Sequence, residues 1–341
     1  MSTFKQLFLM MLTLVSIIAG FHKEASAQST RPMIFLPFQE GLEVYCSQGN
    51  DDTPTHSGSM LYAYDFTGGS DFSIEGTRLY APFSGTVAAV TRNTTSTTGW
   101  GNTIVIKADS NWNNVQVRLA HLQVNTIPSG LSVGSSVNQG DFIGRVGATG
   151  NVTGAHLHIQ MMSGTDINTS IPFDFVEGPV DYDEWLRSDL RANRYVVDNR
   201  GRASVGSPIS NISTSSSGTF TTYSWTDGTH GTDYRGSSSS GARFNWAFRL
   251  NLPLATRTIS ATFSAHCRYY SSADTATAYT VTPSSGTTLR RSLNQRDFRS
   301  GNNYESSIGS ISTTAGTNFT VSAVRGNNRM CADSIVLDLS W

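Results

Sequence analysis

The chain has 341 residues, a length that fits two domains better than one. Hydrophobic residues make up 38% of it and charged residues only 14%, and it contains 31 glycines together with several Ser/Thr-rich tracts. This composition indicates short strands and many turns, which excludes an all-helical protein, and the apolar content excludes wholesale disorder. We therefore expect an all-β protein of two domains.

The first 27 residues differ from the rest. Lys5 precedes an apolar run from Leu7 to Gly20, and the small residues Ala25-Ser26-Ala27 follow it. This order is typical of a secretory signal peptide, and the apolar run is shorter than the ~20 residues of a membrane-spanning helix. We predict that residues 1–27 are removed, that the mature protein is secreted or periplasmic, and that no later segment spans a membrane.

The two halves of the mature chain carry opposite charge. Residues 28–194 contain nine Lys and Arg against sixteen Asp and Glu, a balance of −7, whereas residues 195–341 contain thirteen Arg, no Lys and eight acids, a balance of +5. Opposite signs support two domains, and the basic half could bind an anionic wall polymer, although an ordinary solvated surface explains it equally well. We expect no nucleic-acid partner.

Hydrophobic periodicity predicts strands in both halves. Runs with period two between residues 76 and 161 predict an antiparallel sheet, and runs at 244–250, 259–265, 319–324 and 335–339 predict a β-sandwich. Between them, Asp181–Arg191 is predicted to be a short helix, with acids at its start and arginines at its end. The predicted divisions are therefore a first domain at 28–176, a linker with a short helix at 177–194 and a β-sandwich at 195–341.

The three cysteines are at positions 46, 267 and 331. Cys267 and Cys331 both lie in strand-like sequence of the second half, so a disulfide between them is one plausible pairing in an exported protein. Cys46 lies in a segment without basic residues, so nothing there would lower its pKa, and we interpret it as structural.

Four of the seven histidines fall in the predicted first domain, at His56, His121, His156 and His158. In a strand, residues i and i+2 point to one face, so His156 and His158 can reach the same site. The alternative explanation is that two histidines occur at this spacing on the surface by chance and form no site. The glycine-rich segment Gly147–Gly154 that precedes it favours a site, because glycines let the backbone approach a cleft closely.

Residues 54–162 resemble the lysostaphin-type zinc metallopeptidases of family M23, which cut peptidoglycan cross-bridges. The resemblance lies in three segments: Gly76–Val87, Leu119–Leu122 and Gly150–His158. It implies a single bound Zn²⁺, with His158 as a ligand and His156 assisting the reaction.

The family's other two ligands are a His and an Asp from one early motif. Here that motif corresponds to His56-Ser57-Gly58 and Tyr64-Asp65-Phe66, which implies His56 and Asp65 as metal ligands. The family places its Asp four residues after the His, whereas Asp65 follows His56 by nine. Asp51 and Asp71 are the alternative carboxylate ligands.

Two imidazoles and one carboxylate would leave a fourth zinc position for water, which is typical of a catalytic site. His121 and His156 are then free to move protons or to stabilise the oxyanion, and we predict them to be the catalytic residues. The sequence does not divide these roles between them.

The second half shows a fainter resemblance to golvesin C-terminal-like β-sandwich modules. It lies in Val196–Asn199, Ala278–Val281 and Ala332–Leu337, and it implies a polymer-holding module. Trp246 is predicted to be a core residue. The other aromatic residues considered for stacking on sugars are Tyr223, Trp225 and Tyr234.

Taken together, these features predict a secreted zinc endopeptidase that hydrolyses peptide bonds of peptidoglycan, with a C-terminal targeting module. Two alternatives remain open. The first is a catalytically silent scaffold that binds wall or activates another hydrolase, and the second is a secreted peptidase acting on proteins. Selectivity is expected to lie in loops such as Thr91–Gly101.

Overall fold

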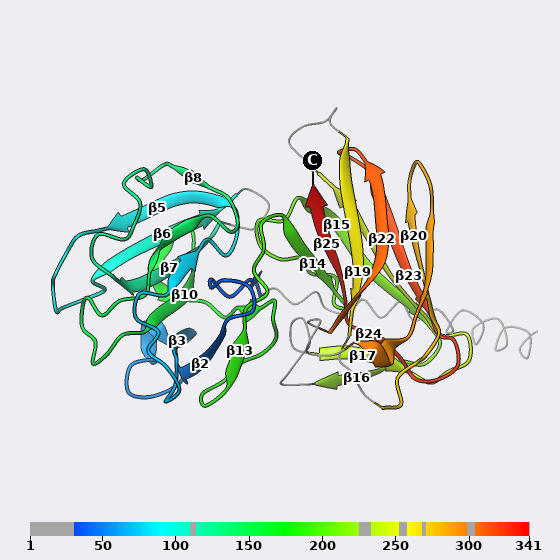
Figure 1. Cartoon of the computed structure of the whole chain (residues 1–341), viewed down its shortest axis with the longest axis horizontal. Coiled ribbons are helices and arrows are strands. Elements are labelled where there is room, and N and C mark those ends of the chain that lie inside the picture. Colours follow the sequence, from blue (N-terminus) through cyan, green and yellow to red (C-terminus); the bar gives the residue numbers. More distant parts are fainter. Residues whose placement is uncertain are drawn as a thin grey trace, which may run out of the picture.

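The computed structural model describes residues 31–109, 114–224, 233–251, 258–267, 271–298 and 304–340. The predicted signal peptide and Trp225 lie outside this range. Two β-rich units lie side by side (Figure 1). Within the described residues there is no α-helix, which confirms the all-β prediction. No helix there is long and apolar enough to cross a membrane.

The first unit consists of short strands with one 3-10 turn, η1 (Gly58–Met60). Its strands are β1 (Met33–Ile34), β2 (Glu43–Gln48), β3 (Ala63–Thr67), β4 (Arg78–Tyr80), β5 (Gly85–Thr91), β6 (Asn102–Ala108), β7 (Val115–Leu122), β8 (Ser136–Val137), β9 (Phe142–Arg145), β10 (Leu157–Ser163), β11 (Asp166–Ser170), β12 (Asp174–Phe175) and β13 (Trp185–Arg187).

Nine of these strands form one antiparallel sheet in the order β13-β2-β3-β10-β7-β6-β5-β8, with β11 added beside β10. The central strand β10 pairs with β3 on one side and β7 on the other. Two small sheets, β4-β9 and β1-β12, complete the unit. The strands predicted to carry the site residues are therefore neighbours.

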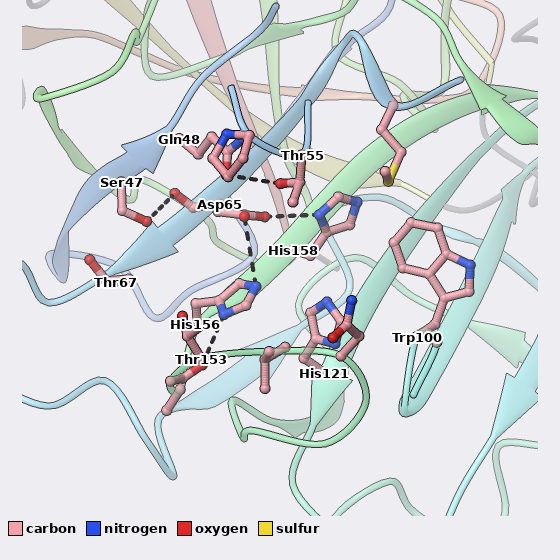
Figure 2. A pocket seen from close by; sticks show the side chains of 17 residues that line it. Ser47, Gln48, Thr55, Asp65, Thr67, Trp100, His121, Thr153, His156 and His158 are labelled. Carbon is pink, nitrogen blue, oxygen red and sulfur yellow. Dashed lines mark hydrogen bonds and ion pairs between the residues drawn. The ribbon is translucent and has the colours of Figure 1, made fainter. Parts of the chain in front are cut away.

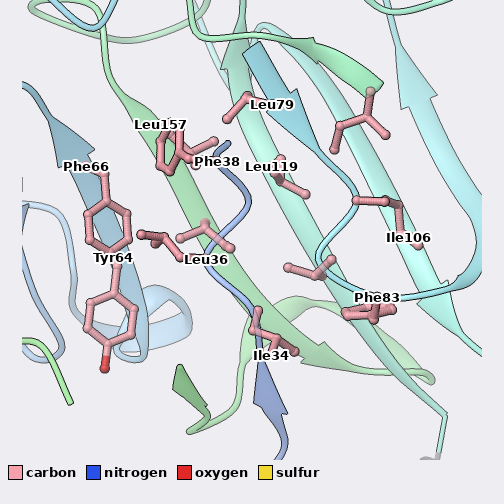
Figure 3. Close-up of a cluster of buried hydrophobic side chains, with 14 of the residues drawn as sticks. Ile34, Leu36, Phe38, Tyr64, Phe66, Leu79, Phe83, Ile106, Leu119 and Leu157 are labelled. Carbon is pink, nitrogen blue, oxygen red and sulfur yellow. The ribbon is translucent and has the colours of Figure 1, made fainter. Parts of the chain in front are cut away.

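One face of this sheet is covered by an apolar core. Leu119 of β7 and Leu157 of β10 are fully buried there, together with Phe66 of β3. The segment that contains Leu36 and Phe38 crosses this face, as Figure 3 shows. Because β-strand side chains alternate between faces, burying this side directs the intervening polar residues to the other side.

The helix predicted for Asp181–Arg191 is wrong. The segment instead contains β13, which pairs with β2 in the register Trp185↔Tyr45 and forms the edge of the sheet. Within β13, Leu186 is buried and its two neighbours are exposed, a period of two that suits a strand. Backbone hydrogen bonds to β2 stabilise this segment as a strand. A short helix with a weak apolar face would gain less, and it would leave the edge of β2 unpaired.

The second unit contains the remaining strands and a 3-10 turn, η2 (Gln295–Asp297). Its strands are β14 (Arg194–Asp198), β15 (Ile209–Ser217), β16 (Thr221–Ser224), β17 (Asp233–Ser237), β18 (Arg243–Leu250), β19 (Ile259–His266), β20 (Thr277–Pro283), β21 (Leu289–Leu293), β22 (Glu305–Thr313), β23 (Asn318–Val324), β24 (Met330–Ala332) and β25 (Ser334–Ser340).

These strands form a four-stranded sheet, β14-β25-β19-β22, a five-stranded sheet, β15-β18-β23-β20-β21, and a small sheet, β16-β17-β24. Trp246 of β18 and Phe263 of β19 belong to one core cluster, so the two larger sheets share a core. Trp246 is 1% exposed and Tyr234 is 4% exposed, which confirms Trp246 as a core residue and leaves neither ring free to stack on a sugar. Cys267 and Cys331 form a disulfide.

The two units are joined by a third apolar cluster. Met33 and Phe35 of the first unit pack in it with Val196 and Val336 of the second. Arg202, which is 1% exposed, donates hydrogen bonds to Asp174 on one side and to Asp198 on the other. The junction is therefore a packed interface, and the divisions 28–176, 177–194 and 195–341 stay a prediction.

Candidate metal centre

Two adjacent strands place the centre of the site. His158 on β10 is the direct cross-strand partner of Asp65 on β3. Directly opposed residues of an antiparallel pair project from the same face with their side chains in contact. The Nδ1 atom of His158 accordingly lies 2.8 Å from Oδ1 of Asp65 (Figure 2).

His56 reaches the same carboxylate from the segment between β2 and η1. Its side chain is fully buried, and its Nδ1–H donates a hydrogen bond to the Gly49 carbonyl at 2.8 Å. The Nε2 atom has no hydrogen-bond partner and lies 3.3 Å from Oδ1 of Asp65. The residues inserted between His56 and Asp65 are therefore accommodated by η1 and its flanks, and the imidazole still reaches the site.

The remaining nitrogen of His158 is also held. Its Nε2–H donates to Oε1 of Gln160 at 3.0 Å, which leaves the Nδ1 lone pair directed at Asp65. Sequence reasoning missed Gln160, although its position two residues after His158 on one strand places both on the same face.

The side chains of His56, Asp65 and His158 suit a metal ion. His56 Nε2 and His158 Nδ1 present lone pairs, and Asp65 presents a carboxylate, with one ligand atom from each residue lying within 4.8 Å of the others. Three converging acceptors repel one another unless a cation lies among them. Imidazole nitrogen and carboxylate oxygen are ordinary zinc ligands, so the residues present fit that metal.

The electrostatics agree with this donor set. Burial alone would raise the pKa of Asp65, but the close approach of the His158 and His56 imidazoles outweighs it and holds that pKa well below its ordinary value. Burial would lower the pKa of His56, and the Asp65 carboxylate reverses this and raises it. Asp65 is thus ionised and available to a cation.

The two predicted catalytic histidines lie beside the triad. His121, the second-to-last residue of β7, has a left-handed conformation (φ 63°), and its Nδ1–H donates to the Thr149 carbonyl at 2.9 Å. Its ring centroid is 4.8 Å from that of His156. Burial, reinforced by the nearby His156, lowers the pKa of His121 to about 4. The Nε2 atom of His156 lies 3.7 Å from Oδ2 of Asp65.

Three of the histidines named from the sequence, His56, His156 and His158, therefore meet at the Asp65 carboxylate, and His121 lies beside His156. The alternative ligands do not join them: Asp51 and Asp71 are exposed, and neither belongs to the metal-ligand cluster. His121, His156 and His158 line a groove of about 700 Å³, as does Asp65 (Figure 2). Trp100 also lines this groove, and the sequence carried no signal for that residue beyond its place in the Thr91–Gly101 loop.

Part of the chain matches a known protein family, and several solved structures are similar to it. Residues 65–169 match Peptidase family M23. Similar solved structures include a mutant catalytic domain of the prophage-encoded M23 protein EnpA from Enterococcus faecalis (23% identity, 40% of this chain and 93% of that chain, TM-score 0.31). Another is the catalytic domain of the antimicrobial peptidase lysostaphin from Staphylococcus simulans (24% identity, 39% of this chain and 88% of that chain, TM-score 0.28). A third is a zinc-containing peptidase from Vibrio cholerae (23% identity, 42% of this chain and 37% of that chain, TM-score 0.25).

The family match and the His56, Asp65 and His158 triad together define a metallopeptidase. Its peptidase domain of family M23 covers residues 65–169. The matched range begins at Asp65, so His56 enters the triad through the geometry of the fold alone. The C-terminal sheets lie outside the match.

Proposed function

We propose that this chain is an exported zinc endopeptidase that hydrolyses peptide bonds of bacterial peptidoglycan. The observation that carries the proposal is the convergence of the His56 and His158 lone pairs on the ionised Asp65 within an M23 peptidase domain. These three side chains would hold the zinc ion. When bound, zinc lowers the pKa of a water to about 7 and polarises the scissile carbonyl.

The proton chemistry belongs to His121 and His156. The Nδ1–H of His121 is donated to Thr149 and that of His156 to Gly154, each to a backbone carbonyl. Nε2 is therefore the atom with which each imidazole exchanges a proton. One of the two takes a proton from the attacking water, and one delivers a proton to the leaving amine.

Export is proposed from the N-terminal sequence and from the disulfide between Cys267 and Cys331, since disulfides persist in oxidising compartments. The C-terminal unit is proposed to hold an anionic wall polymer. Arg243 and Arg249 support this proposal, because both are exposed on the same face of β18. The golvesin-like character of the unit stays a prediction.

Digestion of purified sacculi, followed by mass spectrometry of the fragments, tests the proposal. We expect new amine and carboxyl termini within the peptide cross-links. A zinc-loaded chain that binds sacculi and releases no fragments would be a silent scaffold. Faster cleavage of an unfolded protein such as casein than of sacculi would identify a general secreted peptidase.

A further inference from the structure

Exposed aromatic side chains lie together on the first unit. Among the described residues, five large apolar side chains are exposed, and three of them are aromatic: Phe72, Tyr182 and Trp185. The Trp185 ring centroid lies 6.4 Å from that of Phe72 and 5.5 Å from that of the partly buried Tyr45. Single apolar side chains are ordinary on a protein surface, but a contiguous group indicates a binding surface. We call Tyr45, Phe72 and Trp185 the aromatic strip.

The aromatic strip continues the metal groove along one face of the sheet. Trp185 of β13 is the direct cross-strand partner of Tyr45 on β2, and Tyr45 is the direct partner of Thr67 on β3 (Figure 1). Directly opposed side chains project from the same face. Thr67 lines the groove, two residues after Asp65 on its strand (Figure 2). Because neighbouring strands are about 4.8 Å apart, the indole lies only about 10 Å from Thr67 across the sheet.

The rings of the strip are held in place. Gly69, in the turn that follows β3, has a φ of 59°, and a Cβ there would lie 3.1 Å from Cζ2 of Trp185. The glycine therefore leaves room for the indole against the turn. The Tyr45 hydroxyl donates a hydrogen bond to Oδ1 of Asp183 at 2.7 Å. A ligand that stacks on these rings would immobilise few side chains, so its binding would cost little entropy.

Hydrogen-bond acceptors border the strip. The carboxylates of Asp71 and Asp183 are both exposed, and they lie next to Phe72 in the chain and against the Tyr45 hydroxyl, respectively. A hexopyranose ring has an apolar C–H face that stacks on an aromatic ring, and its hydroxyls donate to carboxylates at the edge. An anionic ligand would instead be repelled by these two acids. The chemistry therefore favours a neutral sugar.

From this arrangement we propose that the aromatic strip binds a neutral N-acetylhexosamine ring of the glycan strand, with Trp185 as the stacking surface. This inference rests on the proposed function, because peptidoglycan carries glycan beside the peptide that the groove would hold. Tyr45 and Trp185 lie outside residues 65–169, so the family match does not account for the strip. The glycan contact adds a second part of the substrate to the peptide contact.

Calorimetry of the full zinc-loaded chain with the β-1,4-linked tetramer of N-acetylglucosamine tests the proposal without turnover. We expect Trp185→Ala to weaken binding about 5- to 50-fold, because the stacking surface is lost, and Trp185→Phe to keep most of the affinity. Ile167→Ala is the matched control, since Ile167 is 44% exposed against 43% for Trp185 and lies outside the strip. No binding by the folded wild type, or equal affinity in Trp185→Ala, would overturn the proposal.

A second variant keeps the test open if Trp185→Ala does not fold. Phe72 lies in a turn and is 40% exposed, so Phe72→Ala should leave the melting temperature nearly unchanged. It should weaken tetramer binding about 2- to 10-fold. A blocked lysine peptide tests the other ligand that aromatic rings and carboxylates could hold, an ammonium group. If this peptide binds, the tetramer does not, and Phe72→Ala weakens the peptide, the strip is a cation site and the glycan proposal is rejected.

Turnover separates this inference from the proposed function. A muropeptide with its disaccharide is compared with the same peptide without sugar. The wild type should cleave the sugar-bearing substrate with a kcat/KM about 3- to 10-fold higher, and Trp185→Ala should bring the ratio close to one. An unchanged ratio in that variant would contradict the glycan contact. Cleavage of neither substrate would reject the proposed function, whereas the calorimetry would still decide whether the strip binds sugar.

Discussion

Gln160 accepts a hydrogen bond from His158, its neighbour on the same face of β10, with the His158 Nε2 and Gln160 Oε1 atoms 3.0 Å apart. Partners of this kind set the tautomer and the orientation of a metal-binding imidazole. Gln160 is fully buried, so it holds His158 in a single arrangement.

Replacing Gln160 by Leu should therefore weaken zinc binding about 10- to 100-fold, as measured by competition with a chelator. Gln160→Glu keeps an acceptor for the Nε2–H and should retain most of the affinity. Gln116→Leu on the neighbouring strand β7 provides a control, since Gln116 is also buried but donates to the Ser163 carbonyl. Equal chelator resistance in the two Leu variants would argue against a positioning role for Gln160.

Replacing His56 by Ala should abolish stoichiometric zinc binding, because it removes one of three ligands. Elemental analysis of the purified variant measures this directly. Asp65→Asn should lose zinc in the same way, whereas Asp71→Asn should keep it, since Asp71 is exposed and outside the triad. Full occupancy in His56→Ala would move the second imidazole ligand elsewhere.

The His121→Ala and His156→Ala variants should keep zinc and lose roughly 10²-fold or more in kcat, because positioned proton transfer contributes ~10²–10⁴. Turnover of a defined muropeptide, with zinc content measured on the same samples, separates this role from metal binding. Near-normal kcat in both variants would show that neither imidazole moves the proton.

Arg202→Ala should destabilise the protein by about 3–5 kcal/mol, because it removes the buried guanidinium that pairs with the buried carboxylates of Asp174 and Asp198. Chemical denaturation measures the free energy of unfolding. Arg191→Ala removes an exposed ion pair with Glu40 and should cost only about 0–1 kcal/mol. Similar losses in the two variants would mean that Arg202 does not stabilise the junction of the two units.

The Cys46 thiol should resist alkylation in the native protein at pH 8. It is fully buried, and that burial raises its pKa far above the ordinary value, so almost no thiolate forms. Mass spectrometry after iodoacetamide treatment should find no label on the folded chain and one label after denaturation without reductant. Rapid native labelling would require an open route to β2.

The sequence by itself determined the all-β class, most of the strands and which histidines lie together in the structure. Strands such as β18 and the first part of β19 bury every second side chain, so apolar residues recur at every second position and the strand can be predicted from the sequence. The His156 and His158 pair was predictable for the same reason. Asp181–Arg191 was misjudged because its pairing partner, β2, lies more than a hundred residues earlier in the chain.

Only the tertiary structure decided how the ligands meet. His158 and Asp65 are 93 residues apart, and they come into contact through the antiparallel register of β10 and β3. The nine-residue spacing from His56 to Asp65 left open whether His56 reached the site, and its buried hydrogen bond to Gly49 shows how it does. Trp100 lies beside His158 for a similar reason: the amides of Gly150 and Asn151 donate hydrogen bonds to the carbonyls of Ser96 and Gly99, which join the Trp100 loop to a distant part of the chain. Local patterns reveal which residues share a strand face, but only long-range pairing brings separate faces and loops together, because its geometry depends on the whole fold.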